Sequence, residues 1–86
     1  MSAPGLLLLL SRSGCHLCEQ LVVDLLDRWP DLVGCLAEAD VDSRDDWQRR
    51  YGLKIPVLLD AQDGTAVCVS QLDPDAIADW RRARGC

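Results

Sequence analysis

Residues 6–18 read LLLLLSRSGCHLC, and the rest of the chain is best interpreted outward from this segment. The leucines at 6–10 are apolar at every position, which is typical of a strand buried on both faces. A short polar loop follows. Apolar residues then recur at helical intervals, at Cys18, Leu21, Val22, Leu25, Leu26 and Trp29. This periodicity predicts an amphipathic helix that begins near Cys15 and ends before Pro30.

The remaining residues alternate between strand and helix patterns. Residues 36–41 alternate between apolar and polar, which predicts a half-exposed edge strand reached by a parallel crossover. Further elements are predicted at 44–51 (helix), 57–59 and 65–69 (strands joined by a turn at 63–64) and from Pro74 onward (a helix capped by Asp73). We therefore expect an α/β fold with the order β-α-β-α-β-β-α. Its four-stranded mixed sheet would carry helices on both faces, with the all-apolar strands inside.

Length and composition limit the protein classes. The chain has 86 residues, which fits one domain over residues 1–86. Its 49% hydrophobic and 27% charged residues are ordinary for a globular domain, and a net charge of −5 argues against a nucleic-acid partner. The leucine run has no basic segment before it and is too short for a signal sequence or a spanning helix. We expect a cytoplasmic monomer with no membrane partner.

The five cysteines do not suggest a disulfide scaffold, because their number is odd and most are widely scattered. Cys35 and Cys68 are expected to behave as small apolar residues in or near strands. Cys86 is the last residue and is expected to be a free, mobile thiol.

Cys15 and Cys18 admit three interpretations: half of a zinc site, an inert pair, or a centre of thiol–disulfide exchange. Zinc requires two further ligands, and the one histidine, His16, lies inside the motif, so no metal is expected. Position favours exchange over an inert pair, because free backbone N–H groups at a helix start stabilise a thiolate. Cys15 would then be the exposed nucleophile and Cys18 the more buried thiol.

Three neighbouring features bear on this chemistry. His16, when cationic, would favour a Cys15 thiolate, although it is explained equally well as a solvated side chain. Arg12 belongs either to an electropositive pocket or to an ordinary solvated loop. The third feature is Ile55-Pro56, where a proline at the start of a strand leaves the Ile55 backbone free for an extended peptide or thiol substrate. The plainer alternative is a trans-proline that merely begins the strand.

Two segments resemble the glutaredoxins. Residues 12–18 (RSGCHLC) are similar to their active-site segment, and residues 51–57 (YGLKIPV) to the segment that carries their cis-proline. The resemblance narrows to short bacterial glutaredoxin-like proteins of the thioredoxin fold. It implies that Cys15 attacks a disulfide and that Cys18 resolves the mixed disulfide. It also implies a cis Pro56, and glutathione held as co-substrate by Arg12 and the Ile55 backbone, with no tightly bound cofactor.

The candidate site therefore contains the catalytic Cys15 and Cys18 and a substrate-binding set of Arg12, His16, Leu17, Lys54, Ile55, Pro56 and Asp73. Residues 69–73 (VSQLD) lack the paired glycines that approach glutathione in glutaredoxins, which leaves glutathione binding open. The leading hypothesis is an oxidoreductase acting on a disulfide-containing protein or a glutathione mixed disulfide. The alternatives are a weakly redox-active binding module and an iron–sulfur cluster carrier.

Overall fold

The structure is a computed structural model that describes residues 6–86, so residues 1–5 of the expected domain lie outside it. Its elements are β1 (Leu7–Ser11), α1 (His16–Arg28), η1 (Pro30–Cys35), β2 (Leu36–Asp40), η2 (Val41–Ser43), α2 (Asp45–Tyr51), β3 (Val57–Asp60), β4 (Ala66–Val69) and α3 (Pro74–Arg84). The predicted α/β class and element order are confirmed, and the two short 3₁₀ helices η1 and η2 are additions to that order. Among the described residues, no helix combines the length and apolar character needed to cross a membrane.

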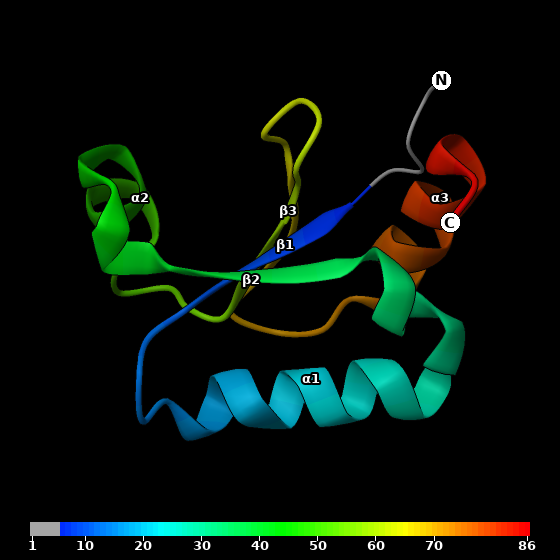
Figure 1. The fold of residues 1–86 in the computed structure, drawn as a ribbon, viewed down its shortest axis with the longest axis horizontal. Coiled ribbons are helices and arrows are strands. Elements are labelled where there is room, and N and C mark those ends of the chain that lie inside the picture. The colour runs from blue at the N-terminus through cyan, green and yellow to red at the C-terminus, as the bar shows by residue number, and fades with distance from the viewer. Residues whose placement is uncertain (1–5) are drawn as a thin grey trace.

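The four strands form one mixed sheet in the order β2-β1-β3-β4 (Figure 1). β1 pairs in parallel with β2 and antiparallel with β3, and β3 pairs antiparallel with β4. The inner strands are β1 and β3, as predicted. Apart from the terminal Ser11 and Asp60 they are entirely apolar, which suits strands that are covered on both faces. β2 lies at an edge, with Glu38 and Asp40 exposed.

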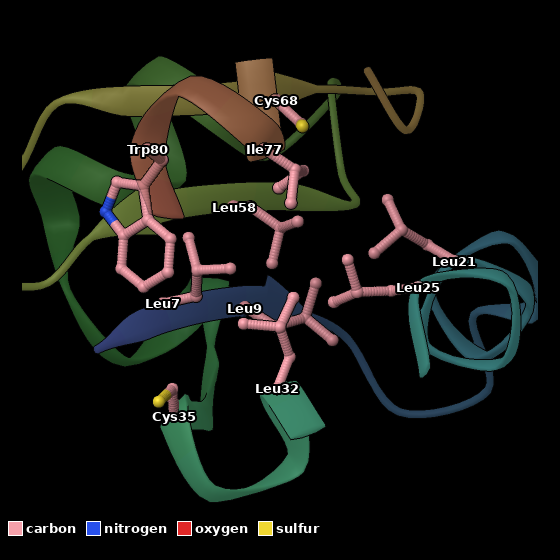
Figure 2. Packing of buried hydrophobic residues seen from close by; sticks show 10 residues of the cluster. All are labelled: Leu7, Leu9, Leu21, Leu25, Leu32, Cys35, Leu58, Cys68, Ile77 and Trp80. Carbon is pink, nitrogen blue, oxygen red and sulfur yellow. The ribbon is translucent and has the colours of Figure 1, made fainter. Parts of the chain in front are cut away.

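Helices cover both faces of the sheet. The larger core cluster joins α1 and α3 to one face of the inner strands through Leu9, Leu21, Leu25, Leu58, Ile77 and Trp80 (Figure 2). The smaller cluster lies on the other face, where Leu10 and Val57 pack with Trp47 of α2. Leu9 and Leu10 serve different clusters because successive strand residues point to opposite faces. Figure 1 shows α1 running below the sheet from the β1–α1 loop to η1.

A disulfide bond joins Cys35, at the end of η1, to Cys86, the last residue. The expectation that Cys86 is a free, mobile thiol is therefore wrong. Cys35 is buried in the core, as expected of a small apolar residue, but it is disulfide-bonded. The bond forms because α3 returns the chain end to η1, where Arg81 pairs with Asp31 and its Nε donates to the Cys86 carbonyl at 2.8 Å. The bonded cysteines are 51 residues apart, so local sequence patterns do not reveal their meeting. Cys68 is buried, as predicted.

Candidate active site

Cys15 and Cys18 lie together at the start of α1, where Cys15 is the N-cap residue. Gly14 precedes them with a φ of 79°, a left-handed conformation that glycine adopts without steric cost. The Cys15 N–H donates to the Arg12 carbonyl at 3.1 Å and closes the turn that leads into the helix. The loop therefore sets Cys15 at the end of the helix that carries unpaired N–H groups.

The two thiols differ in environment. The Cys15 sulfur accepts from the Cys18 N–H at 3.3 Å and from the Cys18 thiol at 2.7 Å, and it is partly exposed. Cys18 is only 3% exposed. Burial, reinforced by the hydrogen bond to Cys15, raises the pKa of the Cys18 thiol to about 12. Cys18 is therefore a neutral donor at physiological pH, and a thiolate on Cys15 would receive both hydrogen bonds.

Arg12 connects three loops around the dithiol. Its guanidinium donates twice to the Asp42 carboxylate, at 2.7 and 2.8 Å, and once to the Gly52 carbonyl at 3.2 Å. The hydrogen bond to Arg12 lowers the pKa of Asp42, and the same bond raises the pKa of Arg12. Arg12 therefore lies beside the dithiol, but Asp42 already balances its positive charge.

A cavity of about 690 Å³ opens beside the dithiol. Its wall includes Arg12, Cys15, Cys18, Glu19, Glu38 and Asp40. The Ser11 hydroxyl donates to Glu38 at 2.8 Å and holds this carboxylate on the β2 side. Sequence reasoning missed the three acidic residues and Asp42. For Glu38 and Asp40 a usable signal did exist, because the carboxyl ends of parallel strands lie at one edge of a sheet, and β1 and β2 end together at the pair Ser11–Asp40.

His16 and Leu17 do not line this cavity. The His16 side chain is 97% exposed and lies 3.7 Å from Glu19, and Leu17 is also exposed. Both predicted site residues therefore face solvent on the first turn of α1.

The Ile55-Pro56 peptide bond is cis, and Pro56 is buried. Val57 pairs with Leu10, so Pro56 lies beside the end of β1, where the dithiol loop begins. The Pro56 carbonyl accepts from the Ser70 N–H at 2.8 Å, and the Lys54 carbonyl accepts from the Ser70 hydroxyl at 2.8 Å. Within residues 6–86, the backbone N–H and C=O of Ile55 take part in no hydrogen bond.

Asp73 is not brought to the dithiol cavity. It is the N-cap of α3, and its carboxylate accepts from the Ala76 N–H at 3.2 Å. It lines a separate hollow of about 380 Å³ formed by residues 67–74. Capping accounts for its position. Across residues 6–86, no three His, Cys, Asp or Glu side chains gather in a way that could hold a metal ion.

Comparisons with known proteins identify the family and support the fold. A family model described as Glutaredoxin-like domain (DUF836) matches residues 6–80. The solution NMR structure of protein Ne2328 from Nitrosomonas europaea is 28% identical, with a TM-score of 0.77 over 93% of this chain and 94% of that one. The X-ray structure of target protein XcR50 from X. campestris is 28% identical, with a TM-score of 0.64 over 90% of this chain and 96% of that one. No curated protein matches the chain.

Proposed function

Because the chain belongs to the family of the glutaredoxin-like domain (DUF836), we propose that it is a thiol–disulfide oxidoreductase that works through Cys15 and Cys18. The observation that carries the proposal is the contact between the two sulfurs, 2.7 Å apart, with the buried Cys18 thiol donating to the partly exposed Cys15. Because Cys15 is the more exposed sulfur, it is suited to attack a substrate disulfide, and the buried Cys18 is suited to resolve the mixed disulfide that forms.

The reaction has two exchange steps. The Cys15 thiolate attacks one sulfur of a substrate disulfide, the substrate S–S bond breaks, and the other substrate sulfur leaves as a thiolate. Cys18 then gives its proton to solvent or to the departing sulfur and attacks the Cys15 sulfur, which releases the second substrate thiol. The substrate gains two electrons, and the protein is left with a Cys15–Cys18 disulfide, which an external thiol reductant returns to the dithiol.

The surroundings of the dithiol favour a polypeptide substrate. The free N–H and C=O groups of Ile55 match the hydrogen bonding of an extended peptide. Leu17 and Leu53 are exposed, and Leu53 follows Gly52, which is tied to Arg12. A polypeptide bound at Ile55 could bury part of the apolar surface of these two side chains.

Single-cysteine variants test the proposal. With a disulfide-containing peptide as substrate, Cys15→Ser should abolish reduction, whereas Cys18→Ser should accumulate a mixed disulfide on Cys15 that intact-mass spectrometry detects. Cys68→Ala is the matched control, since Cys68 is a buried free thiol that lines no part of the dithiol cavity, and it should retain activity. Full activity in Cys15→Ser would overturn the proposal.

A further inference from the structure

We propose that the cavity beside Cys15 makes the protein selective for disulfides that carry a cationic side chain next to the reacting cysteine, and that it disfavours anionic disulfides such as glutathione mixed disulfides. The inference rests on the proposed function, which it refines by naming a substrate class. It concerns the charge of the cavity wall formed by Glu19, Glu38 and Asp40 together with Arg12.

The position of the substrate is set by Cys15 rather than by the acidic residues. In a mixed disulfide, the substrate sulfur is bonded to the Cys15 sulfur, so the residues flanking the substrate cysteine lie within a few ångströms of it. Cys15 and Cys18 both line the cavity of about 690 Å³, which is large enough to receive a flanking side chain. A charged flanking side chain that enters the cavity therefore interacts with its wall.

The carboxylates of the wall lack a permanent cationic partner. Within the described chain, Glu38 accepts from the neutral Ser11 hydroxyl at 2.8 Å, and Asp40 accepts from the Asp42 backbone N–H at 2.8 Å. Glu19 faces only the solvent-exposed His16, 3.7 Å away. The wall thus presents three negative groups that an incoming ammonium or guanidinium group can pair with.

The charge of Arg12 is directed mainly at Asp42, and its interaction with Asp40 is a weaker one without a hydrogen bond. Arg12 is the only basic residue in the cavity wall as formed by residues 6–86, and both of its contacts with a carboxylate go to Asp42. Its remaining contact is with the neutral Gly52 carbonyl. An anionic ligand that approached the guanidinium would meet the paired Asp42 carboxylate there.

Glutathione is poorly matched to such a wall. It carries two carboxylates and one ammonium group at neutral pH, so it would add negative charge beside Glu38 and Asp40. The net charge of −5 on the whole chain acts in the same direction at longer range. A lysine or arginine beside the substrate cysteine is instead attracted both by the carboxylates of the cavity wall and by the net negative charge of the chain.

The experiment uses two short peptides of one sequence, except that lysines flank the cysteine in the first and glutamates in the second. Each cysteine is activated as a 2-thiopyridyl disulfide, and glutathione activated in the same way is the third probe. Release of the thione from reduced protein gives the rate constant for Cys15 attack without a recycling reductant. At low ionic strength, we expect the lysine probe to react about tenfold faster than the other two, with the difference shrinking in high salt.

The double variant Glu38→Gln/Asp40→Asn should bring the rates of the lysine and glutamate probes together. Its matched control, Asp27→Asn/Asp75→Asn, removes as many charges from exposed positions outside the cavity and should keep most of the selectivity. Equal rates in the wild type, or equal loss of selectivity in both double variants, would overturn the inference while leaving the oxidoreductase intact. No reaction with any probe would overturn the proposed function itself.

Discussion

Arg12 and Asp42 form a bidentate ion pair, with hydrogen bonds of 2.7 and 2.8 Å. The pair connects the loop that leads into the dithiol to η2. The same guanidinium reaches Gly52 at the end of α2, so one side chain holds together the segments that follow β1, β2 and α2. Gly52 is needed at this junction because a Cβ there would lie 2.4 Å from the Gln48 carbonyl oxygen. Arg12 therefore holds the segments around the dithiol in place, and Asp42 balances its positive charge.

Releasing Arg12 from this pair should change the response to anionic substrates. Asp42→Asn removes the balancing charge, so the reaction of reduced protein with glutathione 2-thiopyridyl disulfide should become about threefold faster. The matched control is Asp46→Asn. Asp46 is paired with Arg44, the N-cap residue of α2, and it lines no part of the dithiol cavity. Equal acceleration in the two variants would show that only net charge matters and that the Arg12–Asp42 pair has no special role.

The two active-site thiols should differ sharply in alkylation. Burial and the hydrogen bond to Cys15 raise the pKa of Cys18 to about 12, so Cys18 remains a neutral thiol throughout the range of pH 7 to 9. Burial also raises the pKa of Cys68. Iodoacetamide should therefore label native, reduced protein first at Cys15, as peptide mass mapping would report. Labelling of Cys18 as fast as that of Cys15 would contradict this asymmetry.

Asp60 should be the carboxylate on which folding depends most. It is 3% exposed, and it accepts from Trp80 Nε1 at 2.9 Å, Arg84 Nε at 2.6 Å and the Gln62 N–H at 2.8 Å. Because removal of one partner leaves the others unpaired in the interior, Asp60→Ala should lower the free energy of unfolding by about 3 kcal/mol in urea titrations. The control Asp63→Ala removes the exposed partner of Arg84 and should cost much less.

The same residue predicts a pH dependence. Burial opposes ionisation of Asp60, but the hydrogen bonds from Gln62, Arg84 and Trp80 outweigh it and lower its pKa. Because the pKa is lowered in the folded state, ionised Asp60 stabilises the protein at pH values above its unfolded-state pKa of ~4. This contribution is lost as the pH falls through the lower folded-state pKa. The free energy of unfolding of the wild type should therefore decrease as the pH drops below about 4. The decrease should be smaller in Asp60→Ala. Parallel pH profiles for the two proteins would contradict this assignment.

The Cys35–Cys86 disulfide should affect stability without affecting the dithiol. It closes a loop between residues 51 apart, and a chain-entropy model gives about 4 kcal/mol for such a loop. Cys86→Ser should lose a stabilisation of this order in non-reducing urea titrations, and a reducing agent should produce the same loss in the wild type. Peptide reduction should persist in Cys86→Ser, because the chain end lies at the opposite end of α1 from the β1–α1 loop (Figure 1). A wild type insensitive to reducing agent would contradict the prediction.

Most of the fold was predictable because its signals are local. The leucines of β1 and the apolar residues of β3 are buried on both faces, and such strands can be recognised one at a time. The helical spacing that begins at Cys18 and the Asp73-Pro74 cap of α3 lie within a few residues of the elements that they define. The position of Cys15 and Cys18 at a helix start followed from the same short-range patterns.

The element order and the dithiol could be predicted from the amino-acid sequence alone, since strand and helix periodicity and helix capping act over a few residues. The surroundings of the dithiol, in contrast, depend on how the folded elements pack together. Pairing of β1 with β2 brings Glu38 and Asp40 beside Cys18, and it brings Asp42 to Arg12, from which it is separated by the whole of α1. Return of α3 to η1 likewise joins Cys35 to Cys86. The charge of the cavity and the disulfide between Cys35 and Cys86 therefore depend on contacts between residues far apart in the chain, which the residue spacing within one element does not predict.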